Sequence, residues 1–188
     1  MLSRLPHNIL SQLSRNFARP EQILAELDIR EGDTILEIGM PVGYFHRAAC
    51  KLIGPKGTLY IAGPNSESLE HVRSVHEHTH IKPVLLGDVL LGKSIEVGSV
   101  DLVLLTNLLS NSFHPDAFCL SIGQFLKPQS EVVLIDWDTQ QEKVGPLHER
   151  RMSKEQAIQL LAQCGLKFKR VLHITGYHYG LVFSSSLD

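Results

Sequence analysis

The sequence predicts an α/β fold: a three-layer sandwich in which helices cover both faces of a seven-stranded, mostly parallel sheet, with an antiparallel strand pair at the C-terminal end. Short runs of β-branched and apolar residues alternate with helical patterns along most of the chain. Continuous apolar strands of this kind are typical of a parallel sheet that is buried on both faces. Only a Thr175-Gly176 turn separates the last two expected strands, and this is too short for a parallel crossover.

The length and the charge of the chain limit the classes of protein it can belong to. The 188 residues, 43% hydrophobic and 20% charged, predict one domain over 1–188, with an N-terminal helical cap segment at 1–30. There are 18 Lys and Arg and 20 Asp and Glu, for a net charge of −2. Binding to a nucleic-acid backbone requires an excess of positive charge, so we expect a small-molecule substrate and no nucleic-acid partner. A homo-oligomer is left open.

The sequence also predicts a cytoplasmic protein. No apolar run approaches the ~20 residues that span a bilayer, and the N-terminus lacks the continuous apolar core of a signal peptide. Cys50, Cys119 and Cys164 are odd in number and far apart, which fits neither a disulfide framework nor a close-spaced metal site. We therefore expect reduced, buried thiols, no membrane insertion and no metal.

The elements of the first half follow from apolar periodicity and from helix-start signals. An amphipathic pattern predicts a short helix within 1–19, and Pro20 begins a second helix because proline is favoured in a first turn. The β-branched run at 34–39 predicts a buried strand. The other expected elements of this half are a helix at 44–53, a strand at 58–62, a helix from Asn65 or Ser66 to about His78, and a strand at 83–86.

The second half continues the alternation. Apolar runs predict strands at 100–105 and 131–135, separated by a helix at 115–126 that starts at a proline. Ser153 and Gln156 have the spacing of a capping box for a helix that ends at Gly165. The last two expected strands lie at 167–174 and 177–184.

The loop after the strand at 34–39 is the first candidate site, because ligands of open α/β sheets bind beyond the carboxyl ends of the strands. Gly39 and Gly43 allow close approach of the backbone, and the start of the next helix offers free N–H groups. Glu37 would repel a pyrophosphate and attract an ammonium group. A tight strand-to-helix turn that holds no ligand is the alternative interpretation.

Five segments, in this order and spacing, match the pattern of one superfamily. They are the acidic glycine loop at 37–43, Gly87-Asp88-Val89, the apolar strand and its following segment at 99–109, the Leu-Lys-Pro turn and strand at 125–137, and the closing stretch at 145–166. Together they resemble the class I methyltransferases that use S-adenosylmethionine, in particular small members such as the ubiquinone and menaquinone methyltransferases. The resemblance covers about 20–184 and implies a Rossmann-like three-layer sandwich, a single methyltransferase-like domain and methyl transfer to a small molecule.

The resemblance also implies a site for S-adenosylmethionine as cofactor. Glu37, Gly39 and Gly43 would hold its methionine end and Asp88 its adenine. No catalytic residue is assigned, because the sulfonium leaving group is already activated and the reaction needs mainly orientation. The full set of cofactor-binding residues that it implies is Glu37, Gly39, Gly43, Tyr44, Gly63, Asn65, Asp88, Val89, Thr106 and Asn107, the last two near the transferred methyl group.

Two positions depart from the family's pattern. Pro41 replaces the middle glycine of the loop, which removes conformational freedom and one N–H donor. Gly63 stands where the family holds an acid for the ribose hydroxyls, a loss of about 1.5–3 kcal/mol that Asn65 would partly replace. We therefore expect glycine at 41 and Asp at 63 to tighten binding.

These departures keep a second class of function open: a methyltransferase-fold protein with lost or altered cofactor binding that acts as a non-catalytic binding or interaction module. A nicotinamide dinucleotide oxidoreductase would share the sheet, but Glu37 and the antiparallel end pair count against it.

Other residues have chemistry-bearing side chains for which a structural role is the preferred interpretation. We expect a solvated helix end rather than a metal site from His71, His76, His78 and His80, and core packing from Phe45. Arg150 and Arg151 beside Glu149 would clamp an acidic substrate, although a solvated loop is the preferred alternative, and Trp137 lines a pocket or closes the core edge. Candidate bases, each with a surface or capping role as the preferred alternative, are His114, Asp136, His148 and Tyr177.

Overall fold

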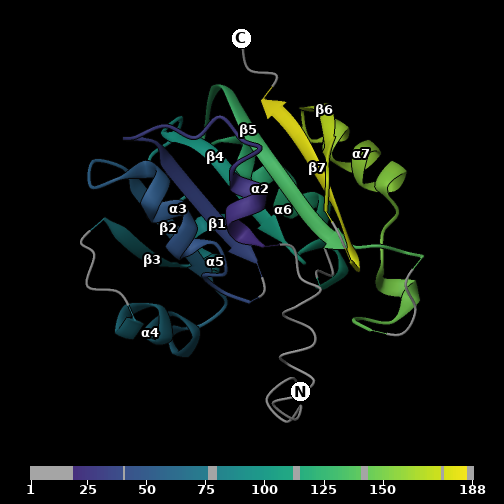
Figure 1. Ribbon diagram of the computed structural model, residues 1–188, viewed down its shortest axis with the longest axis horizontal. Helices are drawn as coiled ribbons and strands as arrows, with labels where there is room; N and C mark the ends of the chain where they lie inside the picture. Colours follow the sequence, from purple (N-terminus) through teal and green to yellow (C-terminus); the bar gives the residue numbers. More distant parts are fainter. Residues whose placement is uncertain are drawn as a thin grey trace.

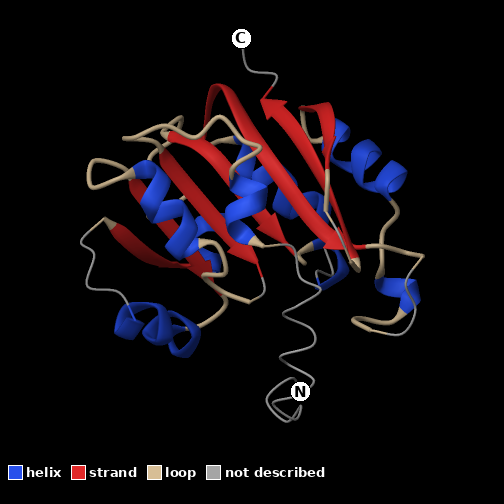
Figure 2. Cartoon of the chain, viewed as in Figure 1, coloured by secondary structure: helices blue, strands red, loops and turns tan. Residues whose placement is uncertain are grey.

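The computed structural model describes residues 19–39, 41–75, 80–111, 115–140, 144–174 and 176–185. These residues form a three-layer α/β sandwich with helices on both faces of a single sheet (Figures 1 and 2). The strands are β1 Thr34–Gly39, β2 Thr58–Gly63, β3 Ile81–Leu85, β4 Val100–Thr106, β5 Leu126–Trp137, β6 Leu166–Leu172 and β7 His178–Ser185. The helices are α2 Pro20–Leu24, α3 His46–Ile53, α4 Ser66–Val75, α5 Leu86–Leu90, α6 Pro115–Gly123 and α7 Lys154–Gln163, with 3₁₀ turns η2 Leu109–Asn111 and η3 His148–Arg150.

The described strands form one seven-stranded sheet in the order β3-β2-β1-β4-β5-β7-β6. β3, β2, β1, β4 and β5 pair in parallel, whereas β7 is antiparallel to both β5 and β6. The predicted fold class and the antiparallel terminal pair are therefore confirmed. The chain leaves β1 in one direction to build β2 and β3 and returns to build β4 on the other side, which makes the β1/β4 junction the topological switch point.

Two apolar clusters cover the two faces of the sheet. Ile35 and Leu104 pack with Leu24 of α2 and Phe45 beside α3 on one face. On the other face Leu36, Val103 and their neighbours pack with residues of α5, α6 and α7, such as Val89, Phe118 and Leu161. Both faces of the central strands are thus buried, as their continuous apolar sequences require.

Several boundaries differ from the prediction. Leu86 belongs to α5 rather than to β3, and the short helix α5 was not expected from the apolar run that contains it. α6 ends at Gly123 because Leu126 already pairs with Val100 in the sheet. The expected Leu-Lys-Pro turn at 125–130 lies largely within β5 as an irregularity between Leu126 and Glu131, with Gln129 at a φ of 63°.

The start of α7 is confirmed in detail. Ser153 Oγ accepts a hydrogen bond from the Gln156 N–H at 3.2 Å, and Gln156 Oε1 accepts one from the Ser153 N–H at 2.9 Å. This reciprocal pair is the capping box that the spacing predicts. The expected amphipathic helix within 1–19 lies outside the described residues except for Arg19.

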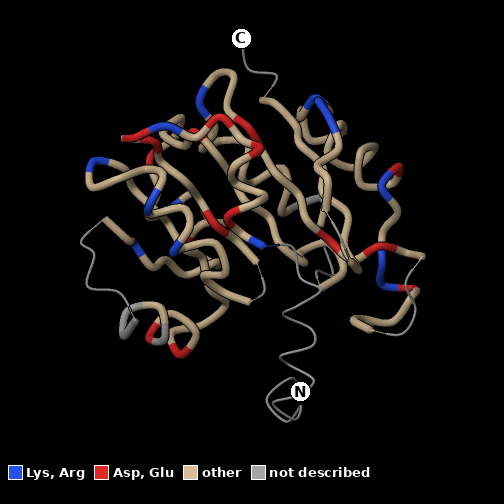
Figure 3. The backbone as a smooth tube through the Cα atoms, in the orientation of Figure 1, with Lys and Arg blue, Asp and Glu red and all other residues tan. Residues whose placement is uncertain are grey.

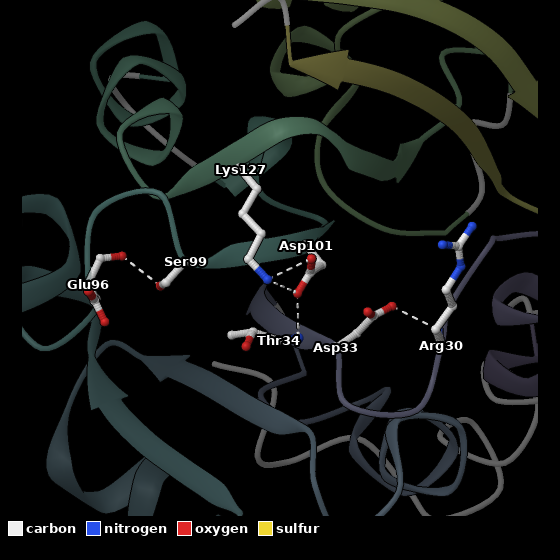
Figure 4. A network of polar contacts seen from close by, with 7 residues as sticks. All are labelled: Arg30, Asp33, Thr34, Glu96, Ser99, Asp101 and Lys127. Carbon is white, nitrogen blue, oxygen red and sulfur yellow. Dashed lines mark hydrogen bonds and ion pairs between the residues drawn. The ribbon is translucent and has the colours of Figure 1, made fainter. Parts of the chain in front are cut away.

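Polar contacts join strands at the amino edge of the sheet (Figure 4). Asp101 accepts a hydrogen bond from the Thr34 N–H at 2.8 Å and forms an ion pair of 2.7 Å with Lys127 Nζ. These contacts link the starts of β1 and β4 to β5, at the edge opposite the candidate site.

Lys and Arg residues are interspersed with Asp and Glu residues along the backbone (Figure 3). None of the helices described is long and apolar enough to cross a membrane. Of the cysteine thiols, Cys119 is buried and Cys50 and Cys164 are half-buried, so the expectation of buried thiols holds for one of the three.

Candidate functional site

The carboxyl ends of β1 and β4 lie side by side, with Gly39 paired to Thr106. A Cβ atom on Gly39 would lie 2.8 Å from the Thr106 Cβ and closer still to its carbonyl oxygen, so this contact requires glycine. Gly43 has a φ of 73°, which glycine adopts without strain. The turn itself therefore requires glycine at both of these predicted positions. Pro41 is exposed in the same loop, and Met40 lies outside the described residues.

Glu37 is buried, with 2% of its surface exposed, and it organises the loop that follows β1. Its Oε1 accepts a hydrogen bond from the Phe45 N–H at 2.9 Å, just before α3 begins. Burial raises the pKa of its carboxyl group from 4.5 to about 7, and hydrogen bonds from the N–H groups of Phe45 and Tyr44 oppose this shift. Among the residues described, Glu37 Oε2 has no hydrogen-bond partner.

Thr106 and Asn107 end β4 and are both buried. Because side chains alternate along a strand, Thr106 faces the same side of the sheet as Leu104, the α3 side that Glu37 also faces. Thr106 Oγ1 has no hydrogen-bond partner within the described part of the chain. Asn107 adopts a φ of 52°, and its N–H donates to the Ile135 carbonyl at 2.8 Å. The structure thus brings Glu37, Gly39 and Thr106 together at the switch point.

The end of β2 is closed by α4. A Cβ atom on Gly63 would lie 2.7 Å from Ser68 Oγ and 2.8 Å from Leu69 Cδ2. The exposed Asn65 caps α4, because its Oδ1 accepts a hydrogen bond from the Ser68 N–H at 2.9 Å. An Asp at position 63 would therefore require the side chains of Ser68 and Leu69 to shift, and the expectation that it tightens ligand binding stays a prediction.

Asp88 and Val89 both lie in α5, and they differ in burial. Val89 is fully buried in the core beneath the sheet, whereas Asp88 is half-buried in the first turn of the helix. Only Asp88 of this pair offers a polar group to a ligand. Tyr44 is half-buried, and its ring meets that of Phe45 edge-on at 5.3 Å. Phe45 itself is fully buried, so its predicted packing role is confirmed.

Asp136, with 1% of its surface exposed, ends β5 and organises the turn that follows β4. Its Oδ2 accepts hydrogen bonds from the N–H groups of Leu109 at 2.8 Å and Ser110 at 3.4 Å, and its Oδ1 accepts one from Trp137 at 2.8 Å. Burial raises the pKa of its carboxyl group. Of the two sequence interpretations of Asp136, the capping role is confirmed.

Arg151 is buried, with 7% of its surface exposed, and the preferred interpretation of a solvated loop is wrong for this residue. Its guanidinium donates to the carbonyls of Pro146 at 3.0 Å, Asp138 at 2.9 Å and Val144 at 2.5 Å. It also lies 5.6 Å from the ring centroid of Trp137. Arg151 thus holds the segment after β5 against the core edge, a role that only tertiary contacts reveal.

Trp137 closes this core edge, which is one of the two roles that we expected for it. Its ring lies 4.2 Å from that of the buried His178, which the sequence interpretation did not single out. Burial, followed by the charge of Arg151, lowers the pKa of His178 to about 4.

The remaining candidates are scattered. His148 and Arg150 are exposed on η3, and Tyr177 and His80 are half-buried. No group of three or more His, Cys, Asp or Glu that could hold a metal occurs among the described residues. His76, His78 and His114 lie outside the described residues, as does the side chain of His71.

A cavity of about 400 Å³ lies between η2 and η3. Its lining includes Leu109, Pro115 and Met152, together with Arg150, Arg151 and Glu149. Its three charged residues could be predicted from the sequence, whereas its apolar lining could not, because the lining residues come from separate segments of the chain. The proline at the start of α6 and the Arg-Arg-Met run were the only available signals.

Comparisons with known proteins identify the fold. No protein-family model matches the chain, and no curated protein matches it by sequence. Among solved structures, it is similar to a SAM-dependent methyltransferase from Aquifex aeolicus, with a TM-score of 0.81 and 21% identity over 96% of this chain and 99% of that one.

Two further structures agree with this match. A methyltransferase from Mesorhizobium loti gives a TM-score of 0.69 and 13% identity, covering 86% of this chain and 95% of that one. Geranyl diphosphate methyltransferase in complex with SAM gives 0.67 and 13%, covering 89% and 84%. The chain therefore has the class I fold of the SAM-dependent methyltransferases, over nearly its whole length.

Proposed function

We propose that this protein binds S-adenosylmethionine at the carboxyl ends of β1 and β4 and transfers its methyl group to a small-molecule acceptor. One observation carries the proposal. Glu37 Oε2 and Thr106 Oγ1 are buried acceptor atoms without a hydrogen-bond partner among the described residues, and they face the same side of the sheet at the switch point. An unsatisfied buried polar atom costs about 1–3 kcal/mol, which a ligand that donates hydrogen bonds would offset.

Glu37 has the chemistry to receive the ammonium group of such a ligand. A neighbouring positive charge favours the carboxylate and would lower the pKa of Glu37 from about 7. Ligand binding near neutral pH would thus be accompanied by release of a proton from Glu37. Because Oε2 is closed to solvent, a ligand reaches it only if the groups that cover it move.

The other cofactor contacts are those that the resemblance implies. Gly39 and Gly43 would allow the backbone to approach the methionine end, Asp88 would bind the adenine, and Asn107 would lie beside the transferred methyl group. Tyr44 borders the loop, while Gly63, Asn65 and Val89 serve the packing and capping of α4 and α5.

The bound cofactor supplies a methyl group on a positively charged sulfur. What the protein supplies is orientation of the acceptor, which contributes about 7–11 kcal/mol in well-aligned reactions. The net charge of −2 supports a small acceptor rather than a nucleic acid. The resemblance to ubiquinone and menaquinone methyltransferases remains a prediction about the subgroup.

A second candidate function is a non-catalytic binding or interaction module that retains the fold. The packing of Gly63 against Ser68 and Leu69 favours it, because these side chains of α4 would have to shift before an acidic side chain for the ribose could be placed there. Pro41 in the glycine loop favours it as well, since it lacks the N–H of a glycine.

Calorimetric titration with S-adenosylmethionine and S-adenosylhomocysteine tests the proposal. We expect both to bind the full chain, and Glu37→Gln to weaken binding about tenfold or more at pH 7.5 because a charged hydrogen bond is lost. Glu31→Gln, at an exposed position in the turn before β1, is the control and should leave the affinity unchanged. Absence of heat and of any thermal shift at millimolar ligand would contradict the enzyme and favour the non-catalytic module.

A further inference from the structure

The cavity between η2 and η3 is lined by residues that follow closely, along the chain, on the end of β4 in the proposed methyl-transfer site. η2 begins at Leu109, two residues after Asn107, and Asp136 at the end of β5 holds its N–H groups. The cavity therefore lies at the carboxyl edge of β4 and β5, the edge at which this kind of sheet binds ligands. Its volume of about 400 Å³ is near the small end of the ~300–1,000 Å³ range of ligand pockets.

The lining of the cavity combines an apolar part with a positive part. Leu109, Pro115 and Met152 supply apolar surface, and Arg150 and Arg151 oppose the single carboxylate of Glu149. An apolar wall with a few charged groups at one end is typical of a site that orients a small amphipathic molecule.

Arg151 contributes positive charge to the lining of the cavity. Its guanidinium donates hydrogen bonds to main-chain carbonyls, and these neutral groups do not cancel its positive charge. The charge contributes to the low pKa of the neighbouring His178. The ten-residue helix α7 adds to this field, because its first turn, with Gln156 in the cavity lining, carries the positive end of the helix dipole.

The geometry points to this cavity as the acceptor site, and to an acceptor that carries a carboxylate on a small apolar body. This inference rests on the proposed function, because the bound molecule is a methyl acceptor only if the protein is a methyltransferase. The carboxylate would lie against the exposed Arg150, and the apolar body of the acceptor would lie between Leu109 and Met152. A guanidinium binds a carboxylate through two parallel hydrogen bonds, which gives orientation as well as affinity.

Benzoate and benzamide are suitable probes, because they have nearly the same shape and differ in charge. In a titration of the full chain without cofactor, followed by ¹H–¹⁵N NMR, we expect benzoate to bind about tenfold tighter than benzamide. The signals of Ser110, Asn111 and Gln156, which line the cavity, should shift. Equal affinity for the two probes, or shifts confined to other parts of the chain, would overturn the inference.

Exposed residues of opposite charge provide a matched pair of variants. Arg150→Gln should weaken benzoate binding about tenfold, and Glu149→Gln should tighten it about threefold, while neither changes the affinity for benzamide. Arg47→Gln, at an exposed position on α3, is the control for a general loss of positive charge. If Arg47→Gln weakens binding as much as Arg150→Gln, the cavity is not the carboxylate site.

The two proposals can fail separately. Charge-dependent benzoate binding in a protein that ignores S-adenosylmethionine would retain the carboxylate site and remove its acceptor role. Cofactor binding together with equal affinity for the two probes would retain the proposed function and overturn the acceptor class.

Discussion

Two buried carboxylates flank the central strand β4, Glu37 on β1 and Asp136 on β5, and the protein satisfies them to different degrees. Both carboxylates accept hydrogen bonds from N–H groups of nearby backbone, and burial raises both pKa values. Asp136 uses both oxygens, on three N–H groups, whereas Oε2 of Glu37 has no partner within the described residues. Equally deep burial thus leaves Asp136 hydrogen-bonded through both oxygens in a turn, whereas one oxygen of Glu37 has no partner among the described residues.

The largest expected effect is the loss of stability on removal of the Asp136 carboxylate, compared with the loss on removal of the Glu37 carboxylate. Asp136→Ala should lower the free energy of unfolding by about 3–4 kcal/mol, because the N–H groups of Leu109, Ser110 and Trp137 lose their acceptor. Glu37→Ala should lower the free energy of unfolding by only about 1–2 kcal/mol. Two N–H groups, of Phe45 and Tyr44, lose their acceptor, but the change also removes the unfavourable burial of a charge, which offsets part of the loss. Urea denaturation at pH 7 measures both; a larger loss for Glu37→Ala would reverse the comparison.

The pH dependence of stability tests the state of Glu37. An acid whose folded pKa is about 7 and whose ordinary value is 4.5 binds protons more tightly in the folded state. Its stabilising contribution is complete below about pH 4.5 and is lost as the pH rises to about 7, an upper limit of roughly 3 kcal/mol. Urea denaturation of the wild type and of Glu37→Gln at pH 5 and pH 7.5 isolates this term. Identical pH slopes would show that the folded pKa of Glu37 is ordinary.

A variant of Arg151 tests whether the hydrogen bonds of this residue hold the segment after β5 in place. Arg151→Met should lower the free energy of unfolding by about 2 kcal/mol, because three carbonyl contacts are lost. It should also raise the pKa of His178 above about 4, since the neighbouring charge is gone. Denaturation and NMR titration of the histidine provide the two measurements. Arg150→Met, at the exposed neighbour, is the control; an unchanged His178 would mean that burial alone sets its pKa.

The smallest expected effect concerns the end of β2. Gly63→Ala should cost about 1–2 kcal/mol, because its Cβ would lie 2.7 Å from Ser68 Oγ. Gly87→Ala is the matched control and should be neutral or slightly stabilising, since no atom lies within 4 Å of a Cβ there and the position is helical. Thermal unfolding of the two variants gives the comparison. If Gly63→Ala is also neutral, α4 yields easily and an acid at position 63 becomes compatible with the fold.

Much of the fold could be predicted from local patterns. β1 matches its predicted range in full, and the capping box of α7 is present atom for atom. Boundaries failed where an apolar run was ambiguous: the segment from Leu86 to Leu90 reads equally as strand or helix, and only Val89 is buried in the helix it forms. Periodicity cannot separate these cases over five residues.

The sequence was enough to predict which loop forms the candidate site, but not which atoms are in contact there. Glu37, Gly39 and Thr106 were named from the sequence, and the pairing of β1 with β4 brings them together. The cavity beside η2 could not be read in the same way, because its lining comes from parts of the chain about 40 residues apart.

By itself, the sequence determined which segments become strands and helices and that a glycine loop with an acid follows the first strand, because these depend on periodicity and local backbone preferences. Only the tertiary structure decided what the polar groups do. Burial raises the pKa of Glu37, three carbonyls hold Arg151, and side chains of α4 pack closely against Gly63. Each of these outcomes depends on which distant residues surround the group, and that is set by the packing of the whole sheet.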